Sequence, residues 1–166
     1  QGMYSWNHLA GEAMEQYGAD RLTVPVELNE REIRDSGIHG EMIVYGYLPM
    51  MISAQCIRKT TLGCSGKPEI MWLKDRKEMR FPVVNQCRFC YNTIYNSAPL
   101  SLLGLSASVE ELGPKALRLN FTVEEPAAAG EILDAFFEEY ALGEKAAEPS
   151  VLKNQFTRGH FKRGVE

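Results

Sequence analysis

The chain has 166 residues, of which 45% are hydrophobic and 24% charged, and its formal net charge is -4. This is the composition of a globular domain with a real core, and its mild acidity argues against a broad nucleic-acid-binding surface. No apolar run approaches the roughly 18 residues of a membrane span, and no basic segment followed by an apolar stretch marks a secretory signal. We therefore expect a cytoplasmic protein with no membrane partner.

The first third of the chain alternates between strand and helix patterns. Residues 1–2 look like the remnant of an expression tag, so we expect the natural protein to extend upstream. In residues 3–47, strands are expected at 4–7, 21–28 and 42–47, and helices at 9–17 and after the N-cap Asn29. The strand at 42–47 is apolar on both faces, as buried parallel strands are. This order predicts two terminal βαβ units of a (β/α) barrel-like region within an α/β fold.

Residues 48–98 differ in character and contain all four cysteines of the chain. A β-hairpin is expected here, with arms at 70–73 and 80–84 around a turn at 75–78. Because proline cannot donate a ladder hydrogen bond, Pro82 predicts an edge strand or a bulge. Residues 91–97 are expected to begin a helix beside the cysteine loop, and the lining of a polar site is the alternative. The region is interpreted as a metal-binding insertion.

Residues 99–143 return to helix and strand patterning. A helix is expected at 99–112, a strand at 117–123 and a final helix beginning near Pro126. The buried stripe expected on that helix consists of Ile132, Leu133, Phe136, Phe137 and Tyr140. Residues 144–166 form a polar linker and a basic tail that contains Arg158, His160, Lys162 and Arg163. This tail is expected either to be solvated or to contact an anion such as RNA.

The cysteines carry the clearest chemical signal. Cys56 and Cys64 are separated by seven residues, and Cys87 and Cys90 by two. A Cys-x2-Cys pair places two thiolates on one metal from a tight turn, and another loop then supplies the remaining ligands. Two disulfides, a redox pair at Cys87 and Cys90, and four unrelated thiols are the alternatives. We predict one metal centre; four thiolates suit both zinc and an iron–sulfur cluster.

Other catalytic patterns are weak or missing. The three histidines, His8, His39 and His160, form no metalloprotease ligand pair, and no serine lies in a Gly-x-Ser-x-Gly motif. Glu27 lies at the end of a strand of the expected barrel-like region, where catalytic groups of barrels collect. One carboxylate assigns no reaction, so the catalytic residues stay unknown.

Several stretches together resemble the collagenase-like peptidase family, the thirty-second family of peptidases of unknown catalytic type. They are YGYLPMMISAQC at 45–56, LKDR at 73–76 with FPV at 81–83, IYNSAPL at 94–100 after the last cysteine, and FTRGHFKRGVE at 156–166. The chain is similar to the C-terminal part of a longer bacterial member.

The resemblance implies that the catalytic region lies mostly upstream and is a partner of this segment. It also implies that Cys56, Cys64, Cys87 and Cys90 hold a four-iron four-sulfur cluster, as in relatives that hydroxylate RNA. An enzyme region for RNA hydroxylation is therefore one expected function. A protease acting on collagen-like or other proteins and a non-catalytic zinc module are the alternatives.

Overall fold

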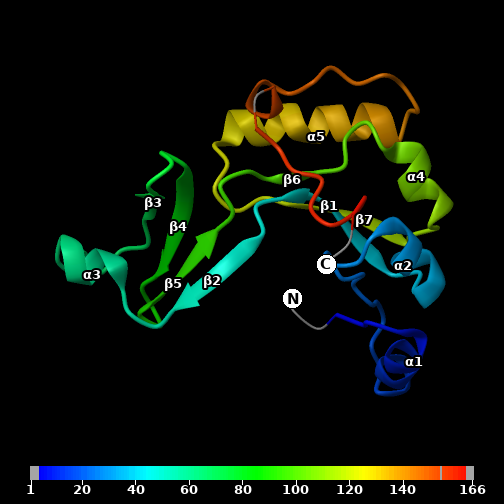
Figure 1. Cartoon of the computed structure of the whole chain (residues 1–166), viewed down its shortest axis with the longest axis horizontal. Helices are drawn as coiled ribbons and strands as arrows, with labels where there is room; N and C mark the ends of the chain where they lie inside the picture. The colour runs from blue at the N-terminus through cyan, green and yellow to red at the C-terminus, as the bar shows by residue number, and fades with distance from the viewer. Residues whose placement is uncertain (1–3, 154, 164–166) are drawn as a thin grey trace.

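The computed structural model describes residues 4–153 and 155–163, so the expected tag remnant at 1–2 lies outside the described residues. The fold is mixed α/β, as the sequence predicts, with two small β-sheets. Figure 1 shows the two sheets side by side, with the longest helix, α5 (Pro126–Tyr140), along one of them. The second sheet projects from this helix-covered part.

The three-stranded sheet has the order β6-β1-β7. These strands are β1 (Glu41–Gly46), β6 (Leu100–Ser101) and β7 (Ala116–Asn120). Strand β1 pairs in parallel with β7 and antiparallel with β6. All six residues of β1 are buried, which confirms the central strand expected from its unbroken apolar run.

Parallel bridges extend this sheet beyond β1. Tyr4 pairs with Thr23, and Thr23 pairs with Glu41 of β1. The strands predicted at 4–7 and 21–28 are therefore reduced to single bridges. Two features explain why the strand expected at 21–28 is so short. Pro25 has no N–H to donate, and β6 occupies the same edge of β1 from Tyr45 onward.

The two helices expected in the first third are confirmed. Helix α1 (His8–Gln16) begins after the N-cap Asn7, and helix α2 (Glu30–Ser36) begins after Asn29. The Asn29 side chain accepts from the Glu32 N–H, and the Glu32 carboxylate accepts from the Asn29 N–H, at 2.9 and 2.8 Å. This reciprocal capping box satisfies two amides that a helix start leaves unpaired.

One hydrophobic core lies between the three-stranded sheet and its helices. The Phe136 ring of α5 lies 6.0 Å from that of Tyr45 in β1 and 5.5 Å from that of Tyr140, centroid to centroid. Ile132 is also fully buried, but Leu133 and Phe137 are exposed. The predicted stripe on α5 was therefore wrong for these two residues, because the sheet covers only a narrow side of the helix.

The helix predicted at 99–112 forms only in its second half, as α4 (Ser106–Glu111). Leu100 and Ser101 instead pair with Gly46 and Tyr45 as β6. A short apolar run fits a strand and a buried helix equally well, so the neighbouring strand decides. The strand predicted at 117–123 is present as β7, although Leu117 on its expected inner face is partly exposed.

The four-stranded sheet carries the cysteine region and has the order β2-β5-β4-β3. Its strands are β2 (Pro49–Ser53), β3 (Ile70–Lys74), β4 (Arg80–Gln86) and β5 (Tyr91–Tyr95). The hairpin of β3 and β4 is confirmed, and its turn is held by Asp75, whose carboxylate accepts from the N–H groups of Lys77 and Met79.

Two predictions for this sheet were wrong. Strand β4 is an inner strand rather than an edge strand; it tolerates Pro82 because its pairing with β5 begins only at Val83. Residues 91–95 form β5 instead of a helix, since the turn after β4 returns the chain antiparallel to it. Tyr91, Thr93 and Tyr95 are typical strand residues, so local preference agrees with this outcome.

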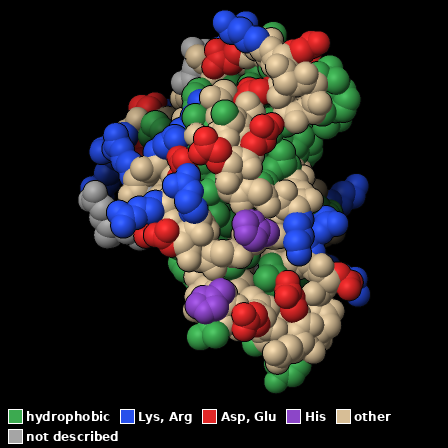
Figure 2. Space-filling model, turned by 90° about the vertical axis from the view of Figure 1, so that its right-hand side faces the viewer, with side chains coloured by type: hydrophobic (Ala, Val, Ile, Leu, Met, Phe, Trp, Pro, Cys, Tyr) green, Lys and Arg blue, Asp and Glu red, His purple; other side chains and the backbone are tan. Residues whose placement is uncertain are grey.

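The C-terminal tail packs against the core through Arg158 and Phe161, whereas Lys162 and Arg163 are exposed, so the expectation of a solvated tail holds only in part. Thr157 forms a parallel β-bridge with Leu100, and the Phe161 side chain is buried. The Arg158 Nη1 group donates to the carbonyl oxygens of Ser101 and Leu103 at 2.7 and 2.6 Å. Lys162 pairs with Glu30 at 2.8 Å. On the face drawn in Figure 2, acidic side chains are interspersed with the basic ones instead of leaving one continuous basic surface.

Replacement of Arg158 by alanine is expected to lower the free energy of unfolding by about 2 kcal/mol, because two partly buried carbonyl groups lose a charged donor. Loss of the guanidinium packed 4.6 Å from the Phe156 ring centroid adds to this. Urea unfolding measures the change. Arg163→Ala, at an exposed position of the same tail, is the control and should change stability by less than about 0.5 kcal/mol. Equal effects of both variants would contradict the structural role of Arg158.

Candidate metal centre

The four cysteines lie on two neighbouring loops of the four-stranded sheet. Cys87 and Cys90 belong to the turn between β4 and β5, and Cys56 and Cys64 flank the short helix α3 (Ile57–Thr61). All four are free thiols, so the disulfide alternative has no support in the described structure. Cys56 and Cys87 are partly buried, and Cys64 and Cys90 are exposed.

The Cys-x2-Cys pair occupies a tight β-hairpin turn. Gln86 pairs with Tyr91 at the end of the two strands, so Cys87 to Cys90 are the four residues that connect them. The Phe89 N–H closes the turn on the Gln86 carbonyl oxygen at 3.0 Å. Cys90 has a φ of 54°, a left-handed conformation that is rare for a non-glycine residue. Such uncommon backbone geometry in a turn frequently accompanies a functional constraint.

The other pair is held by α3 and the loop that follows it. Cys56 is the N-cap of α3, and its Sγ accepts from the Lys59 N–H at 3.5 Å. Gly63 and Gly66 lie on either side of Cys64 with φ values of 85° and 69°. Glycine adopts this left-handed region without steric cost, which lets the chain fold back beside the helix.

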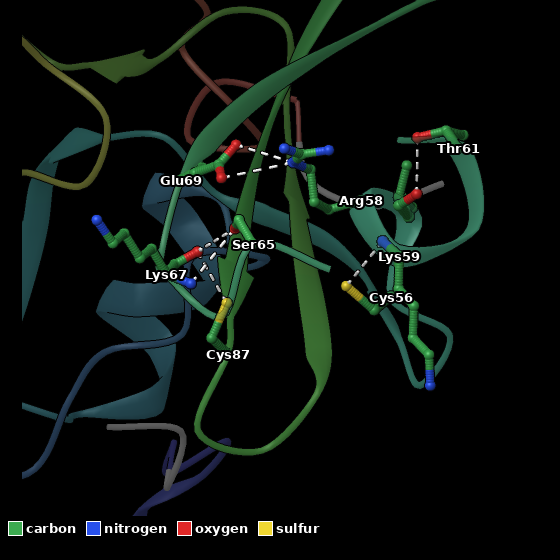
Figure 3. Close-up of polar contacts among 9 residues, drawn as sticks. Cys56, Arg58, Lys59, Thr61, Ser65, Lys67, Glu69 and Cys87 are labelled. Carbon is green, nitrogen blue, oxygen red and sulfur yellow. Dashed lines mark hydrogen bonds and ion pairs between the residues drawn. The ribbon is translucent and has the colours of Figure 1, made fainter. Parts of the chain in front are cut away.

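Polar contacts tie the two loops together, as Figure 3 shows. The Cys87 Sγ–H donates to the Lys67 carbonyl oxygen at 2.9 Å. Arg58 on α3 pairs with Glu69 at 3.2 Å, and the Glu69 carbonyl oxygen accepts from the N–H of Asn85 in β4 at 3.2 Å. The helix, the loop after it and the hairpin are therefore joined, although their cysteines lie far apart in the sequence.

All four cysteines line one small cavity of about 40 Å³. Five other residues complete its wall: Lys59, Gly66, Asn85, Gln86 and Tyr91. The shared wall is the geometric outcome that the sequence spacing alone could not establish. The cavity brings together all four residues that the sequence predicted as metal ligands.

The four cysteines share this cavity without forming a ligand cage. Across residues 4–153 and 155–163, no three Cys, His, Asp or Glu side chains come close enough together to hold one metal ion. Cys87 is instead engaged with the Lys67 carbonyl oxygen, and Cys90 contacts the Cys87 carbonyl oxygen at 3.8 Å. Both contacts place a cysteine sulfur against a backbone carbonyl oxygen.

The surroundings of the cavity shift the pKa values of two groups, Cys87 and Glu69. Partial burial, followed by the neighbouring Cys56, Cys64, Cys90 and Glu69, raises the pKa of the Cys87 thiol. The pKa of the Glu69 carboxyl is lowered, first by the Ser65 hydroxyl and further by Arg58. A cation placed among the thiols would reverse the effect on Cys87, because it favours the thiolate.

Two buried asparagines beside the cysteines are features that the sequence analysis missed. Asn85 of β4 lies opposite Asn92 of β5, and their side chains are 1% and 0% exposed. The Asn92 Nδ2 group donates to the carbonyl oxygen of Gln55, the residue before Cys56, at 2.8 Å. The sequence did carry a signal for Asn85. It lies two residues after the buried Val83 in β4, so both side chains lie on the same face of the strand, and Asn85 interrupts that apolar face with a polar group.

Glu27, the single carboxylate proposed for catalysis, does not line the cysteine cavity. It lies in a turn after the Thr23 bridge, and its Oε2 atom is buried with no hydrogen-bond partner among the described residues. Burial and the nearby Glu27 raise the pKa of Tyr4. The structure therefore separates this carboxylate from the thiol site.

The described helices include none long and apolar enough to cross a membrane. Comparison with known proteins returned no match to any protein-family model, curated protein or solved structure.

Proposed function

We propose that Cys56, Cys64, Cys87 and Cys90 together bind one metal centre, either an iron–sulfur cluster or a zinc ion. The observation that carries this proposal is the common cavity: four thiols from two loops line a single small space. Four unrelated thiols have no physical reason to meet at one point, whereas four ligands of one metal must do so. The cysteines would anchor a cofactor within a larger protein.

The donor set and the backbone fit such a centre. Thiolates are soft ligands and suit zinc and iron–sulfur clusters equally, and the resemblance to the collagenase-like peptidase family favours the cluster. The hairpin turn supplies Cys87 and Cys90, and the capped helix and glycine-bounded loop supply Cys56 and Cys64. In the proposed bound state the cysteine side chains turn their sulfur atoms toward one point in the cavity that they share.

Proton release is part of the proposed binding step. The Cys87 thiol donates a hydrogen bond to the Lys67 carbonyl oxygen. A thiolate has no proton to donate, so deprotonation of Cys87 ends this bond and frees its sulfur for the metal. Metal binding therefore releases protons and strengthens as pH rises toward the thiol pKa.

The wider context of the centre follows from the resemblance. We infer a (β/α) barrel-like region at 3–47, supported by the parallel order Tyr4, Thr23, β1. An upstream catalytic region would complete it, and RNA hydroxylation is the reaction we favour. A protease and a non-catalytic zinc module are the alternatives. Arg158 donates to backbone carbonyl groups and Lys162 pairs with Glu30, so Arg163 is the basic side chain of the tail that we propose for an RNA contact.

Metal analysis of protein made without oxygen tests the proposal. The wild-type chain is purified anaerobically, and iron, acid-labile sulfide and zinc are measured per protein together with the visible absorption spectrum. An iron–sulfur centre is expected to give a brown protein with iron and sulfide in matched amounts. A colourless protein with one zinc supports the zinc module instead.

Two further results bear on the proposal. A chelator that removes the metal should lower the melting temperature, because binding free energy is also folding free energy. A variant with all four cysteines replaced by serine is the matched control and should retain neither metal nor colour. Wild-type protein that holds no iron or zinc, even after reconstitution with each, would contradict the proposal.

A further inference from the structure

The Asn85 side chain is an unusual occupant of the cavity wall. It is 1% exposed, it lines the cavity with the four cysteines, and neither its Nδ2 nor its Oδ1 atom has a hydrogen-bond partner among the described residues. A buried amide without partners is strongly unfavourable, and most buried polar groups in proteins are paired. We therefore expect the hydrogen-bond partner of the Asn85 amide to lie inside the cavity.

The backbone around Asn85 is held in place by hydrogen bonds to neighbouring segments. Its N–H donates to the Glu69 carbonyl oxygen, and Glu69 is held in turn by Arg58. Across the strand pair, Asn92 is anchored by its bond to the Gln55 carbonyl oxygen. Both amides thus project from a rigid sheet toward the face on which the loops of Cys56 and Cys87 lie.

Four thiols contribute to the cavity wall, and they are the groups that an amide donor serves once a metal is bound. A metal centre converts these thiols to thiolates, which accept hydrogen bonds. An amide N–H that donates a hydrogen bond to metal-bound sulfur lowers the negative charge on that sulfur and stabilises the thiolate ligand. Groups of this kind typically change metal affinity tenfold to a hundredfold.

We propose that Asn85 is a positioning residue for the metal centre and that its Nδ2 group donates a hydrogen bond to metal-bound sulfur. Asn92 holds the neighbouring strand and the residue before Cys56 in place. This inference rests on the proposed function. It adds a specific donor that neither the cysteine spacing nor the resemblance identifies.

Cobalt(II) titration of the metal-free full chain tests the inference, because four thiolates bound to Co²⁺ give intense charge-transfer absorption. Asn85→Leu removes the donor and keeps a similar volume. Its Co²⁺ dissociation constant is expected to rise at least about tenfold. The charge-transfer band should also move to lower energy, because a sulfur without the hydrogen bond gives up its electrons more readily.

Asn85→Asp is the second variant and decides the question if Asn85→Leu folds poorly. It keeps the shape of the side chain but has no N–H, so the same weakening is expected. Thr93→Val is the matched control: Thr93 is buried next to Asn92 but points to the opposite face of β5, and this variant should bind Co²⁺ like the wild type.

The melting temperature of the metal-free proteins separates binding from folding. If Asn85 serves the metal, metal-free Asn85→Leu should be no less stable than the wild type, since an unpaired buried amide is lost. Unchanged Co²⁺ affinity and spectrum in both Asn85 variants would overturn this inference alone. Absence of Co²⁺ binding by the wild type would overturn this inference, and absence of iron and zinc after reconstitution as well would overturn the proposed function with it.

Discussion

Replacement of Cys87 by serine is expected to weaken metal binding by about a hundredfold. Binding of a structural metal by four thiolates amounts to roughly 10 to 16 kcal/mol, so one ligand accounts for about 3 kcal/mol. Serine keeps the shape of the side chain but is a poor donor to a soft metal at neutral pH. Competition with a chromophoric chelator measures the change, and the melting temperature in the presence of metal should fall in parallel.

The same experiment distinguishes one shared centre from a metal held by the turn alone. Serine at Cys56 or Cys64 should cost as much affinity as serine at Cys87, because the cavity is lined by all four. Met50→Ser is the control, since it introduces serine at an exposed position of β2 in the same sheet. Full affinity in the Cys56 and Cys64 variants would show that only the Cys-x2-Cys turn binds metal.

Truncation of Phe136 to alanine is expected to produce the largest loss of stability in the helix-covered part, about 3 to 5 kcal/mol. Phe136 is 4% exposed, and its ring contacts those of Tyr45 and Tyr140. Its removal takes apolar surface out of the core and leaves a cavity between α5 and β1. Urea unfolding followed by circular dichroism measures the difference in the free energy of unfolding.

Phe137 supplies a control at the next position of the same helix. Its side chain is 57% exposed, so Phe137→Ala should change the free energy of unfolding by less than about 0.5 kcal/mol. The pair of variants tests which side of α5 faces the sheet. A loss of 2 kcal/mol or more for Phe137 (about the lower bound for a core truncation), or a negligible loss for Phe136, would contradict the packing described here.

Local signals predicted those elements whose causes are local. Helix α2 follows from Asn29 and Glu32, since a capping box needs only residues three positions apart. The hairpin of β3 and β4 follows from its turn, where Asp75 bonds the next amides itself. These elements required no information about distant parts of the chain.

Long-range pairing decided the elements that were predicted wrongly. Residues 100–101 join β1 as β6, and residues 21–28 keep only the Thr23 bridge, because neighbouring strands compete for the same edges of β1. Likewise, Leu133 and Phe137 fit a helical stripe by spacing, but the sheet is too narrow to cover them. The periodicity of apolar residues indicates which face of a helix can be buried, but not which element packs against that face.

By itself, the sequence determined that four thiols in a Cys-x2-Cys and Cys-x7-Cys arrangement were available as soft ligands, since residue type and spacing are local properties. Only the tertiary structure decided that they share one cavity, because the loop after α3 and the turn after β4 meet through sheet pairing and the Arg58–Glu69 contact. It also decided that Asn85 faces them. Burial and the absence of a hydrogen-bond partner depend on the whole fold, and no spacing in the sequence encodes them.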